Sequence, residues 1–153
     1  MSRRRTIGFT LVELMVVVMI VGLLGSIAIP KFSAIRRQAT ATQMVGDFGV
    51  VRHAALSFYV DSGYFPREAG SGAVPASLKK YLPTKYTFKK KQWTMDYENW
   101  TGTTSKAYKA TGIVIGVSFT LQDSLLGKTA MSLMGNEPAV TVGKKYTFLI
   151  SGF

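Results

Sequence analysis

The chain has 153 residues, which suits one compact domain. It carries 19 Lys and Arg against 8 Asp and Glu, a formal net charge of +11. Because 47% of the residues are hydrophobic and 12% aromatic, there is enough apolar material for a core, and the composition excludes a disordered chain. There is no Cys, which excludes a disulfide framework, a thiolate zinc site and a Cys nucleophile.

An apolar segment lies close to the N-terminus. It runs from Phe9 to Ile29, and its only charged residue is Glu13. At about 1.5 Å per residue, a helix of this length reaches roughly 30 Å, the hydrocarbon thickness of a bilayer. Three arginines, Arg3 to Arg5, precede the segment, and basic residues beside a span hold that end in the cytoplasm. The pattern predicts one membrane-spanning helix, with the chain from Lys31 onwards on the other side.

A conventional signal peptide and a simple signal anchor are the alternatives. The apolar stretch is longer than the roughly 7 to 15 residues of a signal-peptide core. A small-residue cleavage pattern is also poor, because Ile27-Ala28-Ile29 is followed by Pro30. Neither alternative explains Glu13, since a carboxylate inside a bilayer costs about 2.5 to 3.5 kcal/mol on insertion scales. Glu13 is therefore a candidate functional residue that needs a partner.

The stretch from Gly8 to Leu14, Gly-Phe-Thr-Leu-Val-Glu-Leu, resembles the processing and assembly motif of type IV pilins and pseudopilins. The close match covers residues 3 to about 32. The resemblance implies that a prepilin peptidase cuts after Gly8 and that Phe9 becomes the methylated N-terminus. It also implies that Glu13 acts in filament assembly. The Glu13 carboxylate would pair with the Phe9 ammonium of a neighbouring subunit, which removes the unpaired-charge penalty when the subunit leaves the bilayer.

Beyond the apolar segment the pattern stays helical and turns amphipathic, with apolar residues at spacings of three and four. We expect one long helix from about Thr10 to Tyr59, whose second half packs on a globular domain. Pro30 removes a backbone donor, so it bends or breaks this helix, and the resemblance places a helix-bending proline there. The resemblance also implies that the part containing Gly22, Gly25 and Pro30 can melt on assembly. Close helix packing is the alternative role of the glycines.

The rest of the chain predicts short elements around an antiparallel sheet. The expected elements are a short helix over 76–81, strands carrying Tyr86 with Phe88 and Trp93 with Tyr97 on either side of a turn at Lys89–Lys91, a strand over 113–119, a helix over 124–134, and a hairpin of 140–142 with 145–150. The fold class is α+β, a long N-terminal helix, transmembrane in its first half, packed on a C-terminal antiparallel sheet. This is the pilin-like roll that the resemblance implies. We expect a basic leader at 1–8, a transmembrane and assembly helix at 9–30, and a globular domain at 31–153.

No catalytic set is visible, so we expect neither enzyme activity nor a cofactor. His53 is the only His, and it is interpreted as a surface or packing residue because no metal-ligand spacing surrounds it. No nucleotide-binding or hydrolase motif is present. Calcium stays open, because Asp123, Asn136 and Glu137 offer the oxygen ligands that suit this ion. Some secretion pseudopilins bind calcium near their C-terminus.

Six lysines gather near Tyr81, Tyr86 and Trp93. They are Lys79, Lys80, Lys85, Lys89, Lys90 and Lys91. Basic residues interleaved with aromatic ones can hold a nucleic-acid backbone or another anion and can stack bases. They can equally form the solvated face of strands and turns, which is the interpretation we favour, with Lys89 to Lys91 in an exposed turn.

The resemblance predicts a structural subunit of a type IV pilus, or of the pseudopilus of a type II secretion system. The alternative is a minor or competence pilin that binds DNA through its lysines. The missing Cys pair departs from many major pilins, whose C-terminal loop is closed by a disulfide. The implied partners are other copies of the chain in a helical filament, the prepilin peptidase, and an inner-membrane assembly platform with its ATPase. The chain would cross the bacterial inner membrane once, N-terminus in the cytoplasm, and then join a periplasmic pseudopilus or an extracellular pilus.

Overall fold

The structure is a computed structural model that describes residues 8–100, 114–135 and 137–152. It divides into two parts, residues 1–37 and residues 38–153. The long helix α1 (Leu11–Ser62) contributes to both parts. The other elements are the 3₁₀ helix η1 (Ala76–Leu78), β1 (Trp93–Asn99), β2 (Val114–Leu121), α2 (Ser124–Met134), β3 (Ala139–Val142) and β4 (Lys145–Gly152).

Helix α1 confirms the long helix expected from Thr10 to Tyr59. It begins at Leu11 and ends at Ser62, and it contains Pro30. Its end is set by Gly63, whose φ of 75° lies in the left-handed region that glycine adopts without strain. The Gly63 N–H donates to the Tyr59 carbonyl at 2.8 Å, so one carbonyl of the last turn keeps a partner.

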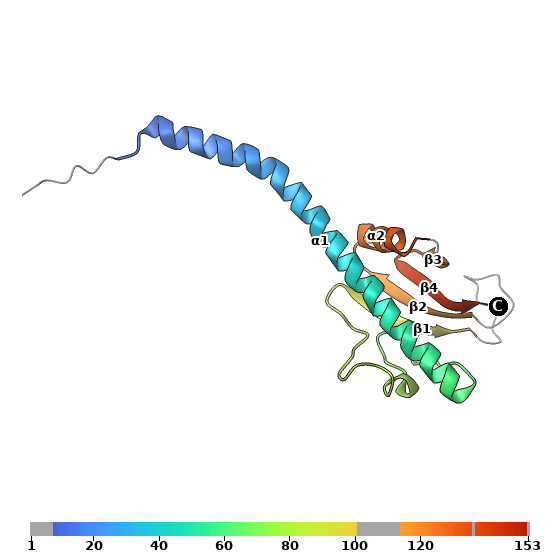
Figure 1. The fold of residues 1–153 in the computed structure, drawn as a ribbon. Helices are drawn as coiled ribbons and strands as arrows, with labels where there is room; N and C mark the ends of the chain where they lie inside the picture. Colours follow the sequence, from blue (N-terminus) through green and yellow to red (C-terminus); the bar gives the residue numbers. More distant parts are fainter. Residues whose placement is uncertain (1–7, 101–113, 136, 153) are drawn as a thin grey trace, which may run out of the picture. The chain divides into compact units, whose positions relative to one another are not determined.

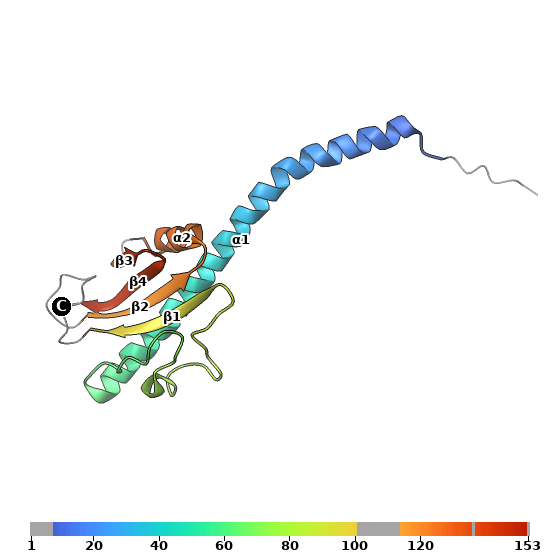
Figure 2. The same ribbon diagram turned by 180° about the vertical axis from the view of Figure 1, so that it is seen from behind.

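The second part of the chain is built on a four-stranded antiparallel sheet with the strand order β1-β2-β4-β3. Figures 1 and 2, which view this part from opposite sides, show the C-terminal half of α1 lying across one face of the sheet. Side chains alternate along β1, so Trp93, Met95 and Tyr97 join the core. The expected α+β fold, a long helix packed on an antiparallel sheet, is therefore confirmed.

A stripe of apolar residues holds the C-terminal half of α1 to the sheet. These buried residues are Ala41, Met44, Phe48, Val51, Ala54, Ala55 and Phe58. Their spacing of three and four residues places them on one face of the helix. The Phe48 ring lies 5.6 Å from the ring of Phe148 in β4, which lies 5.7 Å from Phe119 in β2. Such aromatic pairs add about 0.5 to 1.5 kcal/mol beyond the burial of their surface.

The C-terminal elements also match the expectation. Helix α2 covers the residues predicted for it, and the Asp123 carboxylate caps its first turn by accepting from the Leu125 N–H at 2.9 Å. The hairpin of β3 and β4 turns at Gly143, which has a φ of 61°. The strand expected over 113–119 is β2, which extends to Leu121; residue 113 lies outside the described residues.

Two local predictions were wrong. Tyr86 and Phe88 lie in no strand, and only Lys89 forms an isolated bridge, to Thr94. The Phe88 carbonyl accepts from the Met95 N–H at 2.8 Å, but the Met95 carbonyl accepts from Gly72 instead. Because the Gly72 loop occupies this place on the edge of β1, a regular ladder cannot form there. The helix expected over 76–81 is shorter, since only η1 is helical and turns follow it.

The packing of α2 gives a first testable prediction. A Cβ atom added at Gly127 would overlap the ring of Tyr146, whose hydroxyl donates to the Ser124 carbonyl at 3.1 Å. We expect Gly127→Ala to lower the free energy of unfolding by about 1 to 3 kcal/mol, because the ring has to shift. The measurement is urea denaturation of the detergent-solubilised full chain, followed by tryptophan fluorescence.

Gly46→Ala is the matched control. Gly46 is exposed on α1, and a Cβ added there meets nothing within 4 Å. The same substitution should therefore stabilise the chain by about 0.5 to 1 kcal/mol through helix propensity. Equal stability of the two variants would contradict the close contact between α2 and Tyr146.

Candidate functional site

The residues of the candidate processing site stand directly before α1. Gly8, Phe9 and Thr10 have no regular secondary structure, and Phe9 is 80% exposed. The first helical hydrogen bond runs from the Leu14 N–H to the Thr10 carbonyl at 3.1 Å, so the helix is entered at Thr10. The motif thus places a short non-helical segment in front of a long apolar helix.

Thr10 and Glu13 cap the helix reciprocally. The Glu13 N–H donates to the Thr10 hydroxyl at 3.2 Å, and the Thr10 N–H donates to the Glu13 carboxylate at 3.4 Å. The Thr10 hydroxyl also lies 3.4 Å from the same carboxylate oxygen. This is the capping box of a Thr-x-x-Glu sequence, which satisfies two donors of the first turn. The sequence analysis considered Glu13 as a membrane carboxylate and as an assembly residue, and it missed the capping box, although the Thr-x-x-Glu spacing predicts it.

The N-terminal half of α1 has an uncovered apolar surface. Every large apolar side chain from Phe9 to Ile35 is exposed by half or more. By its length and composition, α1 is the one helix among the described residues that is long and apolar enough to cross a membrane. An 18-residue window in it has a mean hydropathy of 2.6 and no buried residue. A surface of this size needs lipid or other protein to cover it.

The candidate break in the helix is helical here. α1 runs without interruption through Gly22, Gly25 and Pro30, and the Ser33 hydroxyl donates to the Pro30 carbonyl at 2.8 Å. A Cβ added at Gly22 or Gly25 would meet no atom within 4 Å, so neither glycine is closely packed in this structure. Melting of this stretch on assembly stays a prediction.

Five of the six lysines line one of two pockets, and the sixth, Lys89, is exposed and forms the bridge to Thr94. Lys79, Lys80 and Lys85 line a pocket of about 500 Å³, and Lys85 adopts a left-handed φ of 63°. Lys90 and Lys91 line another pocket, which they share with Asp47 and Trp93.

The expectation of a fully exposed turn at Lys89 to Lys91 was wrong for Lys90. Its ammonium lies 3.5 Å from the Asp47 carboxylate and 4.5 Å from the centroid of the Tyr86 ring. The Tyr86 hydroxyl donates to the same carboxylate at 2.7 Å, and burial, followed by this bond, raises the Tyr86 pKa. One lysine of the turn is thus half-buried and has a local partner, which favours a structural role for it.

Replacing Lys89, Lys90 and Lys91 together with Gln should leave folding and DNA affinity nearly unchanged. The two exposed lysines contribute about 0.5 kcal/mol or less each, and the pair of Lys90 with Asp47 contributes up to about 1 kcal/mol. Thermal unfolding and DNA mobility shifts at low and high salt would measure both quantities. A loss of DNA affinity with a flattened salt dependence, in a folded protein, would instead make DNA the ligand of this surface. Lys79, Lys80 and Lys85, changed together, form the matched comparison.

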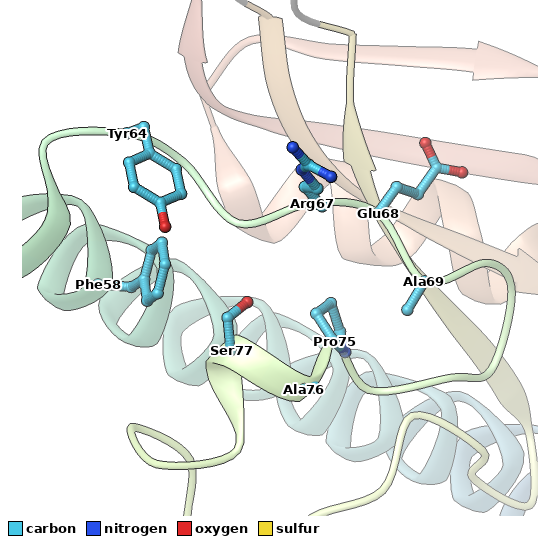
Figure 3. A pocket seen from close by; sticks show the side chains of 8 residues that line it. All are labelled: Phe58, Tyr64, Arg67, Glu68, Ala69, Pro75, Ala76 and Ser77. Atoms are coloured by element: carbon cyan, nitrogen blue, oxygen red, sulfur yellow. The ribbon is translucent and has the colours of Figure 1, made fainter.

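A pocket of about 710 Å³ lies between the end of α1 and the segment that follows it. Figure 3 shows its lining, with Phe58 and Tyr64 at one end and Arg67 and Glu68 farther along. The rings of Phe58 and Tyr64 meet edge-on with centroids 5.4 Å apart. The lining combines an aromatic wall with one basic and one acidic side chain.

Acidic side chains gather on the sheet face opposite α1. Asp96 and Glu98 point to the same side of β1, and Lys145 from β4 reaches both carboxylates. Burial raises the pKa of Asp96 to about 6, and the nearby Glu98 charge adds to this rise, while Lys145 opposes it. Burial alone would lower the pKa of Lys145, but its bonds to the two carboxylates raise it. Sequence reasoning missed this cluster.

The residues expected to offer calcium ligands have other partners. Asp123 caps α2, and Glu137 pairs with Arg52 of α1 at 3.2 Å. Asn136 lies outside the described residues. His53 is exposed on α1.

Comparison with known proteins yields one family model and several relatives. The model, described as the prokaryotic N-terminal methylation motif, matches residues 3–29. The type II secretion system core protein G of Aeromonas hydrophila is 33% identical over 66 residues, 43% of this chain and 46% of that protein. The type IV major pilin protein PilE of Neisseria gonorrhoeae is 31% identical over 70 residues, 46% of this chain and 42% of that protein. Fimbrial protein EcpC of Eikenella corrodens is 30% identical over 76 residues, 49% of this chain and 50% of that protein.

These matches span about half the length of the curated relatives. No solved structure matches the chain. The methylation motif and the named relatives confirm the resemblance to pilins and pseudopilins that the sequence indicated.

Proposed function

We propose that this chain, which resembles the type IV pilins and the type II secretion pseudopilins, is a structural subunit of a filament. The observation that carries the proposal is the uncovered N-terminal half of α1, where every large apolar side chain from Phe9 to Ile35 is exposed by half or more. Lipid covers this surface before assembly, and the same helices of other subunits cover it in the filament. The part from residue 38 onwards, with its own core, would form the body of the subunit.

Glu13 links the two environments. In the bilayer its carboxylate is costly, and the capping contacts with Thr10 reduce the number of unsatisfied polar groups. After cleavage behind Gly8, the Phe9 ammonium of a neighbouring subunit supplies a full positive charge. Pairing with it compensates the buried carboxylate and sets the register between neighbouring helices.

The partners follow from this route. A prepilin peptidase removes residues 1–8 and methylates Phe9, and an inner-membrane platform with its ATPase moves the subunit from the membrane into the filament. The named relatives include a type II secretion protein, a fimbrial protein and a type IV major pilin, so the filament is either a pseudopilus or a pilus. No catalytic role enters the proposal.

The double variant Val12→Cys, Val16→Cys tests polymerisation on a clean background, because the chain has no Cys of its own. Both side chains are exposed by half or more on the apolar helix, and pairing of Phe9 with Glu13 of the neighbouring subunit would place Val12 of one copy level with Val16 of the other. We expect disulfide-linked dimers in the filament fraction of oxidised cells, and their loss when Glu13→Leu is added. A chain that stays monomeric and detergent-extractable under all conditions would contradict the proposal.

A further inference from the structure

Three carboxylates converge on the outer face of the sheet. Asp96 and Glu98 alternate along β1 with the core residues Met95 and Tyr97, and each offers a carboxylate oxygen to the side away from α1. Glu68 comes from the segment that follows α1. One oxygen of each of the three carboxylates lies within 4.8 Å of the others.

The pocket view supports this placement of Glu68. Figure 3 shows the Glu68 carboxylate pointing away from Phe58, Pro75 and Ser77, so it is not committed to the aromatic end of the pocket. At the end of β1, the Asn99 side-chain amide donates to the Pro66 carbonyl at 2.6 Å, which ties the segment before Glu68 to that strand. Glu68 itself is exposed, so it leaves a path to solvent.

The other five acidic residues already have local partners. They are Glu13 with Thr10, Asp47 with Tyr86 and Lys90, Asp61 with Tyr81, Asp123 with the first turn of α2, and Glu137 with Arg52. All eight acidic residues of the sequence lie in the described part of the chain. The trio is therefore the one place in this basic chain where carboxylates gather around each other.

The one ammonium group that the described residues bring to this cluster, that of Lys145, does not compensate the three carboxylates. The Lys145 ammonium contacts a Glu98 oxygen and lies 3.5 Å from Asp96 Oδ2. Asp96 is only 7% exposed, yet its other oxygen, Oδ1, is buried and has no hydrogen-bond partner in the described part of the chain. A buried carboxylate oxygen with no donor is costly, and three carboxylates against one ammonium leave two negative charges uncompensated when all are ionised.

We infer that Glu68, Asp96 and Glu98 form a binding site for a divalent cation, in which Lys145 is a displaceable internal cation. The donor set consists of oxygen atoms only, which suits Ca²⁺ better than a transition metal. The side chain of Lys145 is 40% exposed, so its ammonium can swing into solvent when the ion enters. The ion would give Asp96 Oδ1 the partner that it lacks. This inference concerns the body of the subunit and stands apart from the proposed polymerisation.

Calcium titration of the full chain in detergent tests the site. We expect Ca²⁺ to raise the thermal unfolding temperature with a half-effect near 10⁻⁴ to 10⁻³ M, roughly the range of weak extracellular calcium modules. Asp96→Asn, which keeps the shape and removes the charge, should weaken calcium binding about tenfold or more. Glu137→Gln is the matched control, because it removes an exposed carboxylate elsewhere, and it should leave the affinity unchanged.

The variant Lys145→Gln distinguishes a calcium site from carboxylates that are permanently paired with Lys145. Without calcium this variant should unfold at a lower temperature than the unmodified chain, because its carboxylates lose their cation. With calcium it should recover, and its calcium-induced rise should exceed that of the unmodified chain. The double variant Asp96→Asn, Glu98→Gln serves as the reference without the site. If calcium raises the unfolding temperature of the unmodified chain and of Lys145→Gln no more than that of this double variant, the three carboxylates only form an ion pair with Lys145 and the inference is wrong.

Discussion

Replacing Glu13 with Leu or Ala is expected to leave membrane insertion intact and to abolish incorporation into filaments. Insertion survives because the apolar segment loses its only charge. Assembly fails because the Phe9 ammonium of the neighbouring subunit is left in an apolar surrounding, and removing one partner of a buried pair costs about 3 to 5 kcal/mol. The measurement is an immunoblot that compares the membrane fraction with the sheared or pelleted filament fraction.

Glu13 could act by capping the helix with Thr10 or by pairing with the Phe9 ammonium, and a Thr10 variant distinguishes these two roles. Thr10→Val removes the hydroxyl that accepts from the Glu13 N–H and leaves the carboxylate in place. Loss of an N-cap costs about 1 kcal/mol, so this variant should still assemble. If Thr10→Val and Glu13→Leu fail equally, helix capping explains the effect; if Glu13→Leu forms normal filaments, the carboxylate has no role in assembly.

Replacing Gly8 with Glu should block processing and thereby assembly. A Cβ at Gly8 meets no atom within 4 Å, so the substitution does not disturb the fold described here. The uncleaved chain keeps its three leader arginines and has an amide, not an ammonium, at Phe9, so Glu13 of the neighbouring subunit lacks its partner. Intact mass spectrometry of membrane extracts should show the unmodified chain beginning at a methylated Phe9 and the variant carrying residues 1–8.

Ile7→Ala is the control for this experiment, because it changes the leader and keeps the Gly8–Phe9 bond. It should be processed like the unmodified chain. A mature protein that begins near Lys31 in all three cases would identify a conventional signal peptide and would remove the basis for the proposed filament.

The elements with strong local signals could be predicted from the sequence. α2 follows a capping Asp123, and the β3–β4 hairpin has Gly143 at its turn, so neighbouring residues determine both. The packing of α1 on the sheet follows from its apolar spacing. The supposed strand at Tyr86 and Phe88 failed because Gly72, from a distant loop, takes the carbonyl of Met95. The local sequence around Tyr86 and Phe88 does not predict a hydrogen bond from a distant loop.

The two candidate sites also differ in how far the sequence alone reveals them. Gly8, Phe9 and Glu13 belong to one contiguous motif, so they could be proposed as site residues without a structure, and their roles stay predictions. Lys145 reaches Asp96 because β1, β2 and β4 lie side by side in one sheet, whereas Glu68 comes from the loop after α1. Both segments are far from Asp96 in the sequence. Alternation along β1 placed the core residues correctly, but it gave no reason to expect buried carboxylates on the other face.

The start of the helix at Thr10 determines what the proposed prepilin peptidase would meet at the bond after Gly8. The peptide bond between Gly8 and Phe9 precedes the first hydrogen bond of α1, from Leu14 to Thr10. Proteolysis requires a substrate in extended form, and here that form is available without unwinding a single turn. Cleavage at this bond would therefore leave the helical backbone as it was. The cut would convert the neutral amide nitrogen of Phe9 into a positively charged amino group one turn from Glu13. The charge at the helix start would change while the helix keeps its conformation.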